Sequence, residues 1–231
     1  LYCLFQKFPF FAIPHTVHSL VMDPILFLAI VVVILSIIFH EVAHGYVADL
    51  LGDPTARYSG RLTLNPLPHI DPVGSVLIPG ILALTQSPFL IGWAKPVPYN
   101  PYNLKNRAWG EALVAFAGPA TNILIAVIFG LVLRFNAASL PQDMFELILV
   151  VVYANLALAV LNMLPIPPLD GSKVLKSLLP YNLALSYSRL ETFTYALGPF
   201  GLIGVLLLLV YVFSAPMFAF IRVLFSLIVG F

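Results

Sequence analysis

The sequence predicts an all-α polytopic membrane protein, and three observations point to this fold class. Of its 231 residues, 61% are hydrophobic and only 9% are charged, and the mean hydropathy is +1.00. A soluble domain carries about a quarter charged residues. Several apolar stretches reach the roughly 20 residues that a helix needs to cross a bilayer. One of these stretches is interrupted by prolines and glycines, which is typical of a segment that enters the bilayer without crossing it.

The expected membrane segments follow one another along the chain with short polar connections. The first ends at Gly52-Asp53-Pro54, a helix stop, and a proline-rich polar stretch follows it at residues 55–72. The interrupted stretch comes next and suits a re-entrant or interfacial hairpin. We expect about five to six transmembrane segments, three of which form the core. The apolar segments cover residues 24–51, 73–93, 110–134, 144–164, 194–213 and 217–231.

The chain is expected to contain one membrane-embedded domain, residues 22–231. Residues 1–21 form an N-terminal extension of uncertain status, because they lack the basic start and the cleavage site of a signal peptide. The single Cys3 excludes an intramolecular disulfide and a zinc site built from cysteines. The net charge is +1 and the charges are scattered, so nothing indicates a nucleic-acid partner.

The most informative motif is His40-Glu41-Val42-Ala43-His44, at the end of an apolar run from Ile25 that contains only one polar residue, Ser36. On a helix, His40 and His44 lie on one face, where their imidazoles can share a metal ion. Glu41 can reach a water molecule on that metal and act as general base. Ionisable groups in membrane segments cost several kcal/mol each, so three of them in five residues are hard to explain as packing. The motif predicts a zinc hydrolase that works within the bilayer.

A catalytic zinc ion takes three protein ligands and leaves one position for water. Asp49 and Asp53 follow the histidines too closely to reach back easily, and Asp71 precedes a proline and is placed to cap the next segment. Asp170 follows three prolines that break the helix at membrane depth, where irregular backbone is tolerated only beside protein or a water-filled cavity. Asp170 is therefore the favoured third ligand, with Asp49, Asp53, Asp71 and Glu111 as alternatives.

The position of Asp170 also predicts the topology. To meet the histidines at one depth, the first and fourth segments must end on the same side of the membrane, so residues 73–93 must return to the side from which they came. This side then collects most of the basic residues, and the positive-inside rule makes it cytoplasmic. Arg222, inside the last segment, has no explanation. The basic residues on the proposed cytoplasmic side are Arg57, Arg61, Lys95, Lys105, Arg107, Lys173, Lys176 and Arg189, against Arg134 and Lys7 on the other.

Together, His-Glu-x-x-His and the later Asn162-x-x-Pro-x-Pro-Pro-Leu-Asp170-Gly171 resemble the site-2 protease family of intramembrane zinc metalloproteases. Residues 117–122, Ala-Gly-Pro-Ala-Thr-Asn, match a further family element. Residues 61–66, 69–74 and 92–98 are similar to its compact prokaryotic branch. The resemblance covers residues 23–179 and implies that His40, His44 and Asp170 bind one Zn²⁺ ion, with Glu41 as catalytic acid/base. No PDZ or CBS module is recognisable, and the roughly 17 residues between the second and third segments are too few for a folded domain.

Several polar residues have two interpretations. Asn122, an amide in an apolar helix, could bind substrate or stabilise the oxyanion, or it could be a hydrogen-bonding link between helices. Asn162 is more typical of packing, and a lone loop histidine such as His69 is usually neither ligand nor catalyst. Residues 92–98 could offer an extended edge to a substrate strand, or form a plain interfacial loop with a Trp anchor.

The expected function is zinc-dependent hydrolysis of peptide bonds in or near transmembrane segments of membrane proteins, as in regulated intramembrane proteolysis. The expected partners are a transmembrane protein or peptide substrate and the lipid bilayer, and the expected location is a prokaryotic cell membrane. One alternative is a metal or proton transporter, which would need polar groups spread through the full depth of the bilayer. Another is a zinc-binding membrane protein that does not cleave, against which the intact Glu41 argues.

Overall fold

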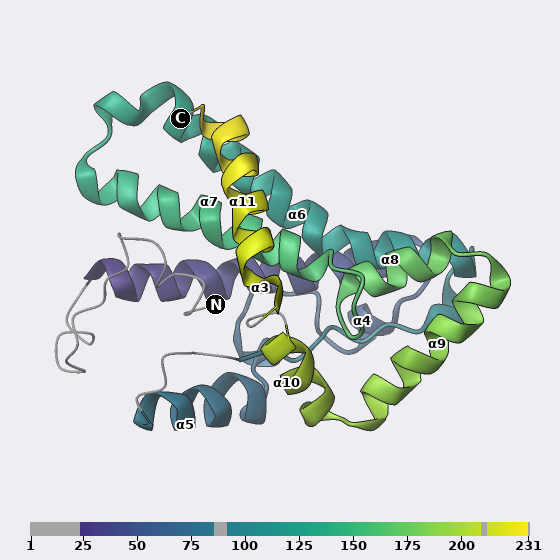
Figure 1. Cartoon of the computed structure of the whole chain (residues 1–231). Coiled ribbons are helices and arrows are strands. Elements are labelled where there is room, and N and C mark those ends of the chain that lie inside the picture. The colour runs from purple at the N-terminus through teal and green to yellow at the C-terminus, as the bar shows by residue number, and fades with distance from the viewer. Residues whose placement is uncertain (1–23, 86–91, 209–211, 231) are drawn as a thin grey trace.

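The computed structural model describes residues 24–85, 92–208 and 212–230, and all regular structure within these ranges is helical (Figure 1). This confirms the predicted fold class. The expected N-terminal extension, residues 1–21, lies outside the described residues.

Three long helices form the core: α3 (Pro24–Leu50), α6 (Arg107–Asn136) and α7 (Gln142–Asn162). Each contains an apolar stretch long enough to cross a membrane. Helix α6 packs against both of the others, and α3 also contacts α7, so the three form one bundle. The protein is an integral membrane protein with the expected three-helix core.

Helix α11 (Ser214–Val229) covers the bundle on the side of α6 and α7. Leu133, Val152, Leu156 and Ile221 are buried where these three helices meet. At the end of α6, Arg134 Nη1 donates to the carbonyls of Leu227 and Ile228, at 3.1 and 3.3 Å. This contact fixes the C-terminal end of α11 to the end of α6 (Figure 1).

The interrupted segment folds back on itself. A π-helical turn (η3, Pro72–Leu77), capped by the Asp71 carboxylate, leads into α5 (Ile78–Leu84), and residues 86–91 lie outside the described residues. The backbone N–H of Trp93 donates to the carbonyl of Gly74 at 3.1 Å, and Ser75 Oγ donates to the carbonyl of Trp93 at 2.8 Å. The chain therefore returns to the point where it entered, as the topology required. A Cβ on Gly74 would enter the Trp93 ring, so glycine is needed for this closure.

The structure corrects the expected segment at residues 194–213. Helix α9 (Tyr181–Ala196) ends there, and Gly198, with φ of +55°, turns the chain before α10 (Pro199–Leu208) begins. Among the described residues, only three helices have full membrane length, and the apolar helices at Pro72–Leu82 and Ser214–Val229 are shorter. The remaining helices are α8 (Asp170–Leu178) and the short α4 (Thr55–Tyr58), η2 (Leu67–His69), η4 (Pro101–Asn103) and η5 (Ala137–Ser139).

Candidate metal centre and active site

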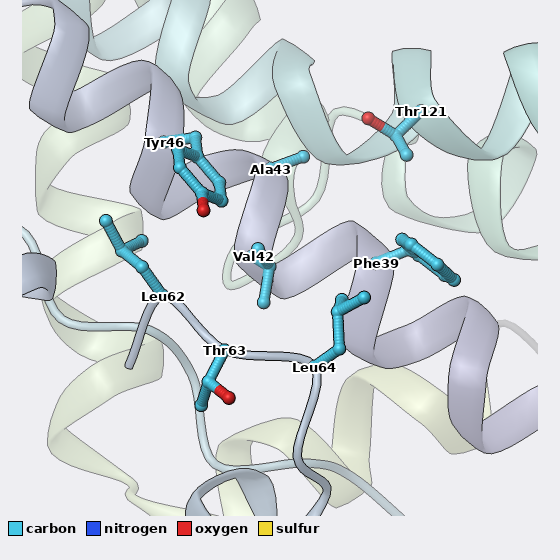
Figure 2. Close-up of a pocket in the computed structure, with 8 residues that line it drawn as sticks. All are labelled: Phe39, Val42, Ala43, Tyr46, Leu62, Thr63, Leu64 and Thr121. Atoms are coloured by element: carbon cyan, nitrogen blue, oxygen red, sulfur yellow. The ribbon is translucent and has the colours of Figure 1, made fainter. Parts of the chain in front are cut away.

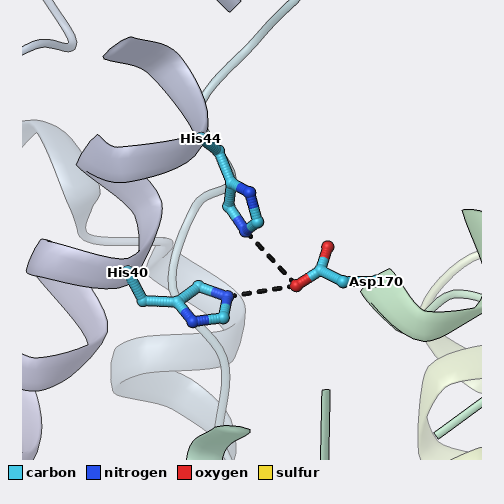
Figure 3. A group of neighbouring side chains, drawn as sticks. All are labelled: His40, His44 and Asp170. Carbon is cyan, nitrogen blue, oxygen red and sulfur yellow. Dashed lines mark hydrogen bonds and ion pairs between the residues drawn. The ribbon is translucent and has the colours of Figure 1, made fainter. Parts of the chain in front are cut away.

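The two motif histidines and Asp170 meet at one point. His40 Nε2 lies 3.1 Å and His44 Nε2 lies 3.3 Å from Asp170 Oδ2. Both rings are buried, and one ligand atom from each of the three residues lies within 4.8 Å of the others. Figure 3 shows the two rings converging from α3 on the carboxylate, which reaches them from the start of α8. The structure thus brings together the three residues that the sequence predicted as ligands.

The outer nitrogen of each ring is held by a hydrogen-bond acceptor. His44 Nδ1 donates to the carbonyl of Val114 at 2.6 Å. His40 Nδ1 lies 2.6 Å from Asn122 Oδ1, and because Asn122 Nδ2 donates to Asn155 Oδ1, the Asn122 oxygen must accept from His40. With the proton of each ring on Nδ1, both Nε2 atoms would present a lone pair to a metal ion at the common point. Neutral imidazoles held in this way are the usual ligands of zinc.

Asp170 is placed by the break after α7. Helix α7 ends at Asn162, and the chain turns through its prolines before α8 starts at Asp170. A Cβ on Gly171 would collide with the carbonyls of Met163 and Leu164, so this residue lets α8 begin directly against the end of α7. Asp170 Oδ2 lies within 3.3 Å of both Nε2 atoms, so an ionised Asp170 would supply the carboxylate oxygen that a metal ligand needs.

The space between the three residues fits a metal ion. A Cβ added to Gly118 of α6 would lie 2.5 Å from His44 Nε2 and 2.6 Å from His40 Nε2. Glycine at this position therefore keeps a gap where the donor atoms converge. Two imidazole nitrogens and one carboxylate oxygen are the donor set of many catalytic zinc sites. The donors, their protonation and the gap all suit zinc.

Glu41 lies next to this group and is half-buried. Its Oε2 accepts a hydrogen bond of 2.9 Å from the backbone N–H of Val97, in the irregular stretch that follows the hairpin. Its Oε1 has no hydrogen-bond partner in the described part of the chain. The hydrogen bond thus fixes Oε2, while Oε1 is free to accept a proton. No pattern in the sequence marked Val97, because this contact joins residues 56 positions apart.

A buried polar network lies behind His40. Asn122 and Asn155 are fully buried, and Asn155 Nδ2 donates to Ser36 Oγ at 2.9 Å. Both side-chain polar atoms of Asn122 are engaged, by His40 on one side and by Asn155 on the other. This geometry favours the interpretation of Asn122 as a link between helices that also orients His40. Ser36 and Asn155 carried a signal in the sequence, since each is a polar residue inside an apolar helix.

The alternative acidic ligands all have other partners. Asp49 pairs with Arg57, Asp71 caps the hairpin, and Glu111 lies 3.6 Å from Lys176 Nζ. Asp53 is fully buried in the connection after α3. Burial would raise the pKa of Asp53, but hydrogen bonds from Thr55, Asn100 and Asn103 outweigh it and hold the pKa below its ordinary value.

The three residues without an assigned role lie outside the cluster. His69 Nε2 bonds to the carbonyl of Thr63 at 2.9 Å, and Asn162 Nδ2 donates to the carbonyl of Leu158 at 3.0 Å. Both contacts are local. Arg222 lines a separate cavity between α7 and α11, together with Tyr153.

A second cavity, of about 300 Å³, lies beside the site on another face of α3. In Figure 2, Phe39 and Val42 of α3 face the loop at Leu64, and Ala43 faces Thr121 of α6. The cavity includes none of the three clustered residues, but Val42 and Ala43 stand between Glu41 and His44 in the motif. Its lining is mainly apolar.

The fold and the site together define a membrane-embedded metallohydrolase. A model of the family described as peptidase family M50 matches residues 135–208, which include Asp170. YwhC of Bacillus subtilis, assigned by its name to the zinc metalloproteases, is 35% identical over 171 residues, which are 71% of this chain and 74% of that relative. The chain belongs to peptidase family M50, the site-2 protease family of zinc metalloproteases.

Further relatives carry the same kind of name. Rip2 of Mycolicibacterium smegmatis is 30% identical over 138 residues, 60% of this chain and 52% of the relative, so the match spans about half of that protein. A relative in Methanocaldococcus jannaschii is 48% identical over 64 residues, 27% of this chain and 32% of that protein. No solved structure matches the chain.

Proposed function

We propose that this protein is an intramembrane endopeptidase that hydrolyses peptide bonds in or near transmembrane segments of membrane proteins. In this proposal His40, His44 and Asp170 hold one zinc ion, and Glu41 is the catalytic acid/base. One observation carries it: two imidazoles, each held at Nδ1 by a hydrogen-bond acceptor, direct their Nε2 atoms at one oxygen of the partly buried Asp170 carboxylate, beside a half-buried glutamate.

The residues of the site divide the work of hydrolysis. When bound, zinc supplies a Lewis acid that lowers the pKa of water and polarises the scissile carbonyl. Glu41 takes a proton from the attacking water on its free oxygen and then delivers it to the leaving amine. The Val97 N–H holds the other oxygen of Glu41, so the carboxylate stays in one orientation. Asn122 and the Val114 carbonyl keep the two rings in the required tautomer.

A substrate of membrane origin fits the surroundings of the site. The face of α3 around the motif is apolar, and the 300 Å³ cavity beside it can receive apolar side chains. A helical substrate must first unwind locally, because its carbonyls are otherwise hydrogen-bonded within the helix. Such cleavage of a membrane-bound precursor would serve regulated intramembrane proteolysis.

We infer that the site lies towards the cytoplasmic side of a prokaryotic cell membrane and that residues 22–231 form the proteolytic unit. Basic residues cluster at the end of α3 that carries the motif. Arg57 pairs with Asp49, Arg61 donates to the carbonyl of Lys95, and the N–H of Lys105 donates to the carbonyl of Leu51. Their common location supports the positive-inside assignment.

The test replaces Glu41 with Gln and measures bound zinc and cleavage of a model transmembrane peptide by the purified protein. We expect one zinc ion per chain and loss of cleavage, with Glu146→Gln, a partly buried position near the start of α7, as the matched control. Cleavage by Glu41→Gln at the rate of the control would contradict the role of Glu41. Metal transport into vesicles without cleavage would favour the transporter, although the polar groups described here gather at one depth.

A further inference from the structure

Arg61 is a buried cation without an acidic partner. Arg61 is only 6% exposed, and no carboxylate of the described residues lies within 4 Å of its guanidinium. Its Nε has no hydrogen-bond partner among the described residues. Burying a charge in this state lowers stability, so a residue of this kind is best explained by what its hydrogen bonds hold in place.

Those hydrogen bonds hold the stretch that contacts Glu41. Arg61 Nη2 donates to the carbonyl of Lys95 at 2.6 Å and to the carbonyl of Pro96 at 3.3 Å. The next residue is Val97, whose N–H meets Glu41. Nη2 carries two N–H groups, so this one nitrogen can serve two neighbouring carbonyls.

The same stretch has few other means of attachment. Pro96 and Pro98 have no N–H, so Val97 carries the only amide proton between Lys95 and Tyr99. Lys95 N–H donates to the carbonyl of His69 at 2.9 Å, and beyond Tyr99 the N–H of Asn100 donates to Asp53 Oδ2 at 2.6 Å. Between these two anchors, Arg61 is the side chain that sets where the Val97 amide lies.

A tight fit against α3 makes this position sensitive to small shifts. A Cβ on Gly45, the residue after His44, would lie 2.8 Å from Val97 Cγ1 and 2.6 Å from Leu62 Cδ2. The Val97 side chain is therefore closely packed against α3, and no space remains between them. A change in the Arg61 contacts has to move the stretch outward, away from Glu41.

We propose that Arg61 is a positioning residue for hydrolysis: it fixes the backbone of residues 95–97 so that the Val97 N–H orients the Glu41 carboxylate. This inference rests on the proposed function, in which Glu41 transfers the proton. The hydrogen bonds of Arg61 include none to the metal ligands, so in this proposal it affects the rate of the chemical step and leaves metal binding intact.

The test compares Arg61→Lys and Arg61→Met with Arg57→Lys, an exposed cation at the same end of α3, in the full chain purified in detergent. Both Arg61 variants should keep one zinc ion per chain and a KM within about twofold, while kcat falls about 10- to 100-fold, since small misplacements of catalytic groups have effects of this size. Lysine should restore little, because its ammonium is a freely rotating group on a shorter, flexible stem and does not hold the fixed direction of a guanidinium nitrogen. An unchanged kcat in a zinc-loaded Arg61→Met protein would overturn the proposal.

A double-mutant cycle separates positioning from a general structural role. Val97→Pro removes the amide proton that meets Glu41 and also changes the side chain that packs on α3, so Val97→Ala, which keeps the amide proton, is its control. If Arg61 acts through this proton, Arg61→Lys should add no further loss of kcat in the Val97→Pro background. Losses that multiply in the double variant would overturn the proposal. Cleavage by wild type but not by Glu41→Gln keeps the proposed function whatever Arg61 does, whereas a wild-type protein that does not cleave would overturn both.

Discussion

Asn122 Oδ1 lies 2.6 Å from His40 Nδ1, on the side of the ring away from Asp170. The Asn122 amide is itself held by Asn155 at 2.8 Å, and Asn155 by Ser36 at 2.9 Å. Helices α3, α6 and α7 thus contribute one polar residue each to a chain that ends on the imidazole. The orientation of His40 is set by the packing of all three core helices.

Replacing Asn122 with Leu should weaken zinc binding about 10- to 100-fold, the usual effect of removing a residue that orients a metal-binding histidine. The reason is that His40 would lose the acceptor that keeps its proton on Nδ1. The measurement is the zinc dissociation constant by competition with a chelator, with Asn136→Leu at the exposed end of α6 as control. Equal affinities of the two variants would show that Asn122 does not orient His40.

Gly118→Ala should abolish zinc binding. The new Cβ would fall 2.5 Å from His44 Nε2, inside the gap between the ligands. Alanine is favoured over glycine in a helix by about 1 kcal/mol, which offsets part of the roughly 1–3 kcal/mol that displacing the two rings costs, so the metal-free protein should remain folded. Bound zinc is measured per chain, and Gly80→Ala on α5, where a Cβ has no neighbour within 4 Å, is the control. A full zinc content in Gly118→Ala would contradict this account of the gap.

The stability contributed by Asp53 should depend on pH. Hydrogen bonds hold the folded-state pKa of Asp53 below its ordinary value, so the stabilisation is present at neutral pH and is lost as the pH falls through the folded-state pKa. Asp53→Asn should therefore unfold more easily than wild type at pH 7, by about 1–2 kcal/mol, and the difference should shrink below about pH 4. Thermal unfolding in detergent across this range measures it, with the exposed Asp143→Asn as control. A difference that stays constant with pH would contradict the assignment.

Lys176 should tie α9 to the core. Its ammonium lies 2.9 Å from Glu191 of α9 and 3.6 Å from Glu111 of α6, and all three side chains are mostly buried. Lys176→Met should loosen α9 by about 1 kcal/mol and leave two carboxylates without their cation. Limited proteolysis with chymotrypsin should then cut faster after Tyr181, at the start of α9, than in wild type or in Arg189→Met. Identical cleavage rates would show that the ion pairs do not hold α9.

The parts of the site that could be predicted from the sequence are those with a local signal. His40 and His44 share a helix, and Asp170 stands out because prolines break the chain just before it. The return of residues 73–93 followed from the need to bring these three residues to one depth. The break between α9 and α10 also had a local signal, the Gly198-Pro199 pair. The apolar residues on both sides of this pair made the segment resemble one continuous helix.

The parts that could not be predicted are contacts between distant segments. Val97 meets Glu41 across 56 positions, and Asn155 meets Ser36 across 119. A valine amide has no distinguishing chemistry in a sequence, and the role of Arg61 depends on two carbonyls, which every residue carries. Such contacts are set by how the loops pack on α3, and no periodicity records that packing.

The closure between Gly74 and Trp93 also makes the topology insensitive to what lies between them. Because the two ends of the hairpin meet, any number of residues inserted or deleted in between changes only how deeply the hairpin reaches, and the number of membrane crossings before α6 keeps its parity. The direction in which α6, α7 and Asp170 face is thereby independent of the hairpin's length. This part of the chain can vary in length during evolution, or carry an engineered insertion, without turning the catalytic half of the protein around.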